Sequence, residues 1–321
     1  MGSNPLEAID SWGIQLQGLE RPGAVAALRR AAIDLVVIEP TNSVRGNEAY
    51  PIANVVRELH ASGGSRRKGK LVVAYLDIGQ AEDYRTYWQP DWIAPTPNSV
   101  GRPDFLLALD PDGWPGNYPC KYWDPRWKRI LFGSPNAMLD RILDAGFDGV
   151  YLDWILGYRE PSVVEAAKRD GVDAAAAMVT LLEELRAYAK AKNDAFVLIA
   201  QNAAWLGDDA PGFEATIDAL AHEDLTFRGD ASAHWDDENA GGIDTTRERC
   251  NGSPSDPLLD RLAFLNKRGL PILTLDYAVR TEDVRTAHER SVGVGFVPTI
   301  SRTPLDRLPP HVRTLAAPVP R

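Results

Sequence analysis

The sequence predicts an α/β fold and, within that class, a closed (β/α)8 barrel of the TIM-barrel type. Eight short apolar or β-branched runs alternate with helical stretches, a pattern typical of a parallel sheet covered by helices. The chain has 321 residues, and barrels of about 250 residues or more commonly form one domain. A G-x-G-x-x-G motif after the first strand and a G-x-x-x-x-G-K-[ST] motif are both absent. An open nucleotide-binding sheet therefore lacks its main sequence support.

The expected strands and helices follow one another in order along the chain. The strands are Gly13–Gln17, Leu35–Glu39, Leu71–Ile78, Gly149–Trp154, Phe196–Gln201, Ala219–Asp224, Pro271–Asp276 and Gly295–Ser301. The helices are Gly23–Ala32, Ala49–His60, Pro135–Ala145, Val172–Lys192, Pro211–Ile217, Pro257–Lys267 and Glu282–Arg290. Several of these helices begin at Pro or are followed by Gly, as helix ends commonly are.

We predict one catalytic barrel over residues 11–305, with residues 1–10 as a leader or expression-vector remnant and residues 306–321 as a tail. Residues 80–134 form a connection far longer than the usual βα loop of about 2–6 residues. This connection holds Trp88, Trp92, Trp114, Trp123 and Trp127. We expect an aromatic insertion that folds over the carboxyl-terminal end of the barrel. A satellite core without a direct function is the alternative.

Composition excludes several classes of partner. The net charge is -10, and no basic stripe is present that would bind a phosphate backbone, so nucleic acid is not an expected partner. No apolar run reaches the length of about 18 residues that a membrane span needs. Cys120 and Cys250 are the only cysteines. They lack the spacing of a zinc site, and one bridge between two loops stays open.

Side-chain alternation along the strands predicts a ring of polar groups inside the barrel. In Leu71–Ile78, outward Leu76 and Ile78 leave Tyr75 and Asp77 inward. The same parity turns Tyr151 and Asp153 inward, and it also predicts inward side chains for Gln15, Gln17, Glu39, Glu223 and Asp276. All lie near the carboxyl ends of their strands, where barrel enzymes keep their active sites.

The residue types that are missing narrow the chemistry. The first strand carries Gln15-Leu16-Gln17 where a metal-dependent barrel hydrolase would carry His-x-His, and His222 has the parity opposite to Glu223. No metal or other cofactor is expected. There is no G-x-S-x-G elbow, and the last two strands are not followed by Gly-rich phosphate loops. The candidate catalytic groups that are left are paired carboxylates surrounded by aromatic side chains, and these are the groups used in glycoside hydrolysis.

Several motifs resemble glycoside hydrolase family 114, the endo-α-1,4-polygalactosaminidase family. They are Ala74-Tyr75-Leu76-Asp77-Ile78-Gly79-Gln80-Ala81-Glu82-Asp83-Tyr84-Arg85, Pro115-Gly116-Asn117-Tyr118, Lys121-Tyr122-Trp123-Asp124-Pro125, Gly146-Phe147-Asp148-Gly149-Val150-Tyr151-Leu152-Asp153 and His222-Glu223-Asp224-Leu225. The resemblance extends from Trp12 to about Ile300. At Asp77-Ile78-Gly79 the chain departs from the family, whose characterised members more often have Ser-Ala-Gly, and this departure opens the question of sugar specificity.

The resemblance implies a retaining endo-α-glycosidase that cleaves α-1,4-linked galactosamine-containing exopolysaccharide. It assigns Asp153 as nucleophile and Glu223 as acid/base. It also favours a secreted or cell-envelope protein, and we expect a monomer whose partner is a polysaccharide or oligosaccharide. Sugar contacts are expected from Gln15, Glu39, Tyr75, Asp77, Trp154, Asn202 and Asp276.

Three alternatives stay open. They are a carbohydrate-binding barrel without turnover, a glycosidase of another α-linked sugar, and a lyase or isomerase of small acids. Retention of both Asp153 and Glu223 argues against the first. The third would need a Lys or a metal in the ring, and none of the eight expected strands contains a Lys.

Overall fold

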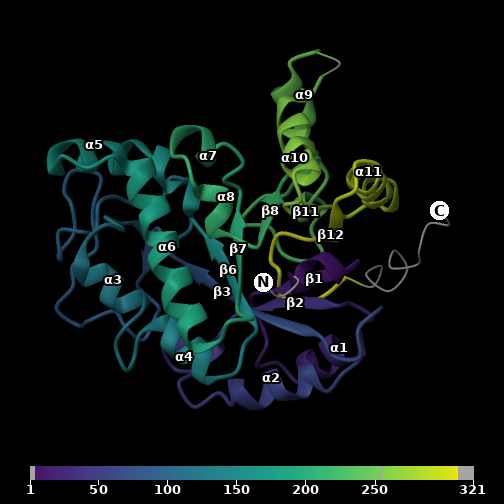
Figure 1. The fold of residues 1–321 in the computed structure, drawn as a ribbon, viewed down its shortest axis with the longest axis horizontal. Coiled ribbons are helices and arrows are strands. Elements are labelled where there is room, and N and C mark those ends of the chain that lie inside the picture. Colours follow the sequence, from purple (N-terminus) through teal and green to yellow (C-terminus); the bar gives the residue numbers. More distant parts are fainter. Residues whose placement is uncertain (1–3, 254, 310–321) are drawn as a thin grey trace. The chain divides into compact units, whose positions relative to one another are not determined.

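The computed structural model describes residues 4–253 and 255–309, so Met1–Ser3 of the expected leader and residues 310–321 of the expected tail lie outside it. Eight parallel strands form one sheet in the order β1-β2-β3-β6-β7-β8-β11-β12 (Figure 1). β1 also contacts β12, and the Trp12 indole N–H donates to the Val297 carbonyl oxygen over 2.9 Å. The sheet is thus a nearly closed barrel with helices between its strands, and the predicted (β/α)8 class is confirmed.

The strands and helices have the following bounds. The sheet contains β1 Trp12–Gln15, β2 Leu35–Ile38, β3 Leu71–Asp77, β6 Gly149–Asp153, β7 Val197–Gln201, β8 Ala219–Glu223, β11 Ile272–Tyr277 and β12 Val297–Ser301. Two antiparallel pairs are β4 Gln80–Glu82 with β5 Asn117–Pro119, and β9 Phe227–Arg228 with β10 Ile243–Asp244. The helices are α1 Ala24–Arg30, α2 Ile52–His60, α3 Pro125–Leu131, α4 Met138–Asp144, α5 Pro161–Asp170, α6 Ala174–Lys192, α7 Leu206–Asp209, α8 Phe213–Thr216, α9 Thr246–Cys250, α10 Pro257–Lys267 and α11 Thr281–Val292.

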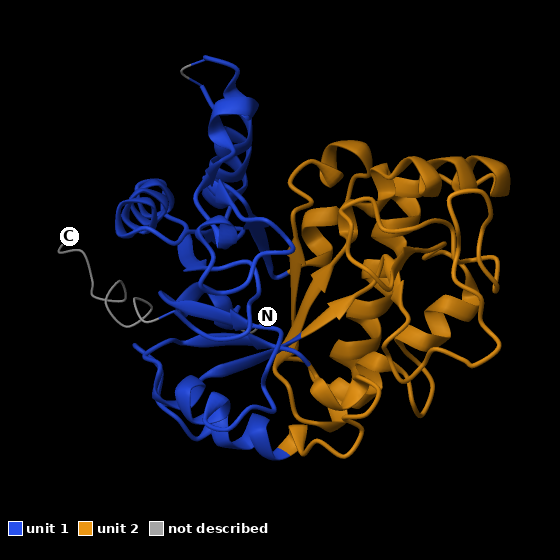
Figure 2. Ribbon diagram, turned by 180° about the vertical axis from the view of Figure 1, so that it is seen from behind, with its two compact units in different colours: residues 1–39, 54–74, 218–321 blue, residues 40–53, 75–217 orange. Residues whose placement is uncertain are grey.

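The chain divides into two compact units (Figure 2). Unit 1 comprises residues 1–39, 54–74 and 218–321, and it contains β1, β2, the first part of β3, β8, β11 and β12. Unit 2 comprises residues 40–53 and 75–217, and it contains the end of β3, β6 and β7.

All eight predicted strands occur within two residues of their expected ends. Each is a short apolar run that is too short for a buried helix. Helix ends follow their capping residues. Asp256 accepts from the backbone N–H groups of Leu258 and Leu259 at the start of α10, and Pro257 occupies the first helical position. α3, α5, α7 and α9 were not predicted; α5 buries only Val163, Ala166 and Ala167, too weak a stripe to detect.

The long connection after β3 belongs to unit 2 and contains its own aromatic core. Trp88 and Trp92 have ring centroids 5.1 Å apart, Trp92 lies 5.4 Å from Phe105, and Phe105 lies 5.9 Å from Trp127. Trp127 is fully buried, and its indole N–H donates to the Ile78 carbonyl oxygen over 2.9 Å. These rings therefore pack against one another as an aromatic cluster, in which Trp88 and Trp92 remain partly exposed. Trp114 differs, since its side chain is exposed.

A buried ion pair fixes the start of this insertion. Arg85 is completely buried, and its Nε donates to Oε2 of Glu82 over 2.6 Å while Nη2 donates to Oε1 over 3.1 Å. Nη1 donates to the Ser43 hydroxyl over 2.8 Å. Such a fork-to-fork contact satisfies both charged groups inside the protein. The pair ties the hairpin of β4 and β5 to the segment that follows β2.

We expect Arg85→Met to lower the free energy of unfolding by about 3–5 kcal/mol, because the variant leaves the Glu82 carboxylate buried without its counter-charge. Urea denaturation followed by tryptophan fluorescence measures this loss. The control is Arg126→Met, which removes the ion pairs of an arginine side chain that is 47% exposed, to Asp104 and to Asp124. That variant should lose no more than about 1 kcal/mol. Equal losses in the two variants would contradict a structural role for the Arg85 pair.

Candidate active site

Asp153 ends β6 in unit 2 and is held by two hydrogen-bond donors. The Tyr75 hydroxyl on β3 donates to Oδ2 over 2.6 Å, and the Trp154 backbone N–H donates to Oδ1 over 2.6 Å. Donors to a carboxylate stabilise its ionised form and fix its orientation. Asp153 is only partly buried, so part of the residue remains exposed to solvent. The structure thus brings together three of the predicted site residues, Tyr75, Asp153 and Trp154.

Gly79 permits a close approach of two loops beside Asp153. A Cβ at Gly79 would lie 2.4 Å from the Trp154 carbonyl oxygen, which no side chain tolerates. The backbone N–H of Ile78 also donates to the Asp153 carbonyl oxygen over 3.2 Å. The glycine in Asp77-Ile78-Gly79 therefore has a packing reason, which the sequence alone did not supply.

Asp77 is buried at the end of β3, in the same unit as Asp153. Its Oδ1 accepts from the backbone N–H groups of Gly79, over 3.0 Å, and Gln80, over 2.7 Å. Its Oδ2 has no hydrogen-bond partner among the described residues. Burial, followed by the charges of Asp153 and Glu82, raises the pKa of Asp77 well above its usual value. Asp77 thus caps the turn with one oxygen and keeps the other unsatisfied.

Three strands that adjoin in the sheet end in the same uncommon backbone conformation. Trp154, Asn202 and Asp224 directly follow β6, β7 and β8, and their φ values are 61°, 63° and 60°. Positive φ is common only for Gly, tolerated by Asn and Asp, and strained for Trp. Strain of this kind clusters at functional sites. The Asn and Asp side chains were a sequence signal for it, whereas nothing in the sequence indicated it for Trp154.

Glu223 ends β8 in unit 1 and is also partly buried. The Tyr277 hydroxyl donates to its Oε2 over 3.2 Å. Register explains the contact: Glu223 lies beside Leu275 of β11, so Tyr277, two residues on, shares its face. Tyr277 was not among the predicted site residues. Its place at the end of a strand with the right parity would have identified it.

His222 points to the face opposite Glu223, as its parity predicts. It lies beside Thr274, whose hydroxyl donates to the Ser291 hydroxyl of α11 over 2.9 Å, so this face is turned to the helices. Burial, aided by the charge of Arg249, lowers the pKa of His222 to about 4. Its Nδ1 has no hydrogen-bond partner among the described residues. His222 is therefore a buried neutral residue outside the proposed chemistry.

His222 makes stability depend on pH in a defined window. The unfolded chain binds a proton below about pH 6.5, whereas the folded protein does so only below about pH 4. Stability is therefore lost as pH falls between these values, by about 3 kcal/mol in total. His222→Gln should remove this slope in urea titrations at pH 4.5 and 7. Asp276, whose pKa is raised to about 6 mainly by burial, has the opposite slope but is common to both proteins. Parallel pH curves for the two proteins would contradict the assignment.

Two of the inward side chains predicted from parity, Gln15 and Asp276, are wrongly oriented. Gln15 lies beside Ile38, and Ile38 lies beside Ala74, so Gln15 has the face opposite to Tyr75. Its Nε2 donates to the carbonyl oxygens of Gln17 and Asp306, each over 3.1 Å. The prediction failed because the end of β1 is bound by the segment after β12, which hides the polar side chain from water.

Asp276 shares the helix-facing side of Thr274, two residues earlier on β11. Its carboxylate accepts from backbone N–H groups of the segment that follows β8. Glu39, directly after β2, has the parity of Val37 and hence of Val73 and Tyr75, as predicted, and it is buried. Among the three predicted acids of unit 1, Glu223 is thus the most accessible.

Both cysteines are free thiols, so the bridge left open from the sequence is not formed. Cys120 is buried, and its thiol donates to the Gly79 carbonyl oxygen over 3.2 Å. Burial raises the pKa of the Cys120 thiol well above its usual value. Oxidation proceeds through the thiolate, and this site disfavours that form.

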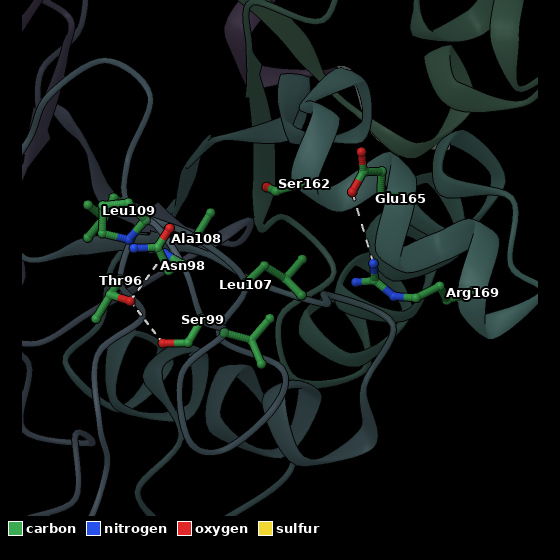
Figure 3. Close-up of a pocket in the computed structure, with 11 residues that line it drawn as sticks. Thr96, Asn98, Ser99, Leu107, Ala108, Leu109, Ser162, Glu165 and Arg169 are labelled. Atoms are coloured by element: carbon green, nitrogen blue, oxygen red, sulfur yellow. Dashed lines mark hydrogen bonds and ion pairs between the residues drawn. The ribbon is translucent and has the colours of Figure 1, made fainter.

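Unit 2 also contains a cavity of about 480 Å³ between the insertion and α5 (Figure 3). Val100, Leu107 and Leu109 line it, and at its edge Glu165 and Arg169 approach each other to 4.0 Å. None of its described lining residues is a predicted site residue. Across residues 4–253 and 255–309, no group of three or more His, Cys, Asp or Glu is arranged to hold a metal ion. The same described residues include no helix long and apolar enough to cross a membrane.

The chain is similar to known proteins over most of its length. The model of glycoside hydrolase family GH114 matches residues 3–315. An uncharacterised protein of Deinococcus radiodurans is 35% identical over 94% of this chain and 83% of its own, and one from Thermotoga maritima is 31% identical over 92% and 82%.

Solved structures share the fold. The glycoside hydrolase domain of PelA from Pseudomonas aeruginosa has a TM-score of 0.60 at 19% identity, covering 94% of this chain and 98% of that one. Aspergillus fumigatus Ega3, solved in complex with galactosamine, has a TM-score of 0.58 at 18% identity and covers 93% of both chains. Because the family model spans nearly the whole sequence, the chain belongs to glycoside hydrolase family GH114 and is a glycoside hydrolase.

Proposed function

We propose that this glycoside hydrolase is a retaining endo-α-glycosidase that cleaves α-1,4-linked galactosamine-containing polysaccharide. In this proposal Asp153 is the nucleophile and Glu223 is the general acid and base. The observation that supports it is that the two carboxylates have similar surroundings. Each ends a strand of the same sheet, each is partly exposed, and each accepts a hydrogen bond from a tyrosine hydroxyl at the end of another strand.

The two hydrogen bonds at Asp153 support its role as nucleophile. Attack on the anomeric carbon needs an ionised carboxylate in a fixed orientation, and donors on both oxygens favour that state. Asp153 then forms the glycosyl-enzyme bond while Glu223 gives its proton to the leaving oxygen. In the second step Glu223 takes a proton from water, which attacks the same anomeric carbon and releases Asp153.

Two observations support an amino-sugar substrate. The chain carries a net charge of -10, which favours a cationic polymer over an anionic one. The structurally similar Ega3 was solved with galactosamine.

Product analysis by mass spectrometry tests the proposal. Polymers of galactosamine, N-acetylgalactosamine and mixed composition, together with an α-glucan, are each incubated with the enzyme and, as a control for contaminating activity, with Asp153→Ala. Oligosaccharide ladders from the galactosamine-containing polymers are expected with the wild type only. Cleavage of α-glucans alone would replace the sugar with another α-linked one. Binding without products on every polymer would favour a carbohydrate-binding barrel.

A further inference from the structure

We infer that Asp276 is a positioning residue for Glu223: its buried carboxylate anchors the segment after β8 and thereby sets the orientation in which Glu223 works. The inference rests on the proposed role of Glu223 and concerns unit 1 alone. Asp276 is 1% exposed, so it has no direct access to a polysaccharide.

The carboxylate of Asp276 binds the backbone of the segment that follows Glu223. Its Oδ1 accepts from the backbone N–H groups of Thr226, over 2.6 Å, and Phe227, over 2.9 Å. These two amides begin three residues beyond Glu223, where the chain has left the sheet. Charge-assisted bonds to paired amides are among the stronger hydrogen bonds in proteins. An anchor this close to Glu223 limits the movement of its backbone.

Three consecutive residues of β11 hold the same stretch of chain. The Leu275 carbonyl oxygen accepts from the Asp224 backbone N–H over 2.9 Å, the Asp276 carboxylate binds the two amides, and the Tyr277 hydroxyl reaches Glu223. Asp224 meanwhile adopts a φ of 60°, which turns the chain sharply after Glu223. A residue other than Gly keeps this uncommon conformation only where the surrounding contacts support it. Asp276 supplies the central contact of that set.

A second group of residues also binds the segment that follows Glu223. The Arg249 guanidinium donates to the Leu225 carbonyl oxygen over 2.6 Å, and Asp256 accepts two bonds from the same guanidinium. The Thr245 hydroxyl contacts the carbonyl oxygens of Asp224 and Thr226. Burial raises the pKa of Asp276 to about 6 against the lowering effect of the two amides. Burying an ionisable carboxylate lowers the stability of the fold. A requirement for activity would explain why this carboxylate is kept to anchor the segment after Glu223.

The test compares Asp276→Ala with Asp276→Asn and with a matched control. Asp276→Ala removes the acceptor, and a shift of Glu223 by about 1 Å should lower kcat on polygalactosamine about 100-fold with little change in KM. Asp276→Asn keeps an oxygen for the two amides and should retain kcat within about tenfold. The control is Thr274→Val, which removes the buried hydrogen bond to Ser291 on the same face of the same strand.

Azide distinguishes misplacement of Glu223 from general loosening of the fold. On a galactosamine oligosaccharide with a 2,4-dinitrophenyl leaving group, azide should accelerate Asp276→Ala, as it accelerates Glu223→Ala, and should not accelerate the wild type or Thr274→Val. Asp276→Ser, whose shorter hydroxyl cannot span both amides, gives the same comparison if Asp276→Ala is isolated unfolded.

Equal losses in Asp276→Ala and Thr274→Val, or no azide response in Asp276→Ala, would overturn the inference and leave Asp276 with a purely structural role. Glu223→Ala separates this failure from that of the proposed function. If Glu223→Ala keeps its turnover, the proposed acid/base is wrong. If Glu223→Ala loses turnover while Asp276→Ala does not, only the positioning inference fails.

Discussion

Asp153→Ala is expected to lower kcat on polygalactosamine by at least about 10⁴-fold, because a retaining glycosidase without its nucleophile cannot form the glycosyl-enzyme intermediate. The fold should persist, since Asp153 is partly exposed and its removal leaves Tyr75 able to bond to water. Initial rates from reducing-end assays, with circular dichroism as the check on folding, measure the effect. Asp170→Ala, which removes an exposed partner of Lys121 in the same unit, should keep turnover within about twofold.

Azide rescue identifies the face of the sugar ring that Asp153 attacks. In Asp153→Ala the anion should take the place of the lost carboxylate and give a glycosyl azide of inverted configuration from an activated glycoside. A product of retained configuration, or turnover near that of the wild type, would show that another carboxylate is the nucleophile. Glu39 and Asp77 would then be tested first, because both have the parity of Tyr75.

Glu223→Ala has the second largest expected effect. Removing a general acid and base costs about 10²–10⁴-fold in rate, and the loss should be greatest for the polymer, whose leaving hydroxyl group needs a proton. A 2,4-dinitrophenyl leaving group needs none, so the first step on that substrate should be nearly unaffected and the glycosyl-enzyme should accumulate as a burst. Stopped-flow absorbance at the dinitrophenolate band follows it.

The stereochemistry of rescue checks the Glu223 assignment. Azide should restore turnover of Glu223→Ala with retained configuration, because the anion attacks the glycosyl-enzyme that Asp153 has formed. Glu248→Gln, a change on the exposed part of α9, serves as the unit 1 control and should behave as the wild type. Absence of a burst together with an equal loss on both substrates would contradict the acid/base role.

The eight strands could be predicted because each is a short apolar run, and such a run is buried whatever the exact packing of its neighbours. The faces of individual residues were harder to predict. Parity identified Tyr75, Asp153 and Glu223 correctly, since apolar neighbours fix the outward face of those strands. It failed at Gln15 and Asp276, because both are polar residues on the helix-facing side that bond to backbone groups supplied by distant segments. Sequence alone does not indicate which segment supplies such a partner.

The long insertion was recognised by its length and its tryptophans, but not by its packing. Trp88, Trp92 and Trp127 could equally have lined a sugar cleft, and only the ring contacts assign them to an aromatic cluster. Asp77 illustrates the opposite case. Its position near the site followed from parity, whereas its unsatisfied Oδ2 depends on how the turn at Gly79 and Gln80 uses the other oxygen.

The configuration of the first product tests the central claim most directly. Proton NMR of wild-type enzyme with a short α-1,4-galactosamine oligomer resolves the anomeric signals before mutarotation mixes them. Two displacements, first by Asp153 and then by water activated by Glu223, predict that the α anomer appears first and decays slowly to the equilibrium mixture. A β anomer as the first product would indicate a single displacement by water, and the assignment of Asp153 as a covalent nucleophile would then be wrong.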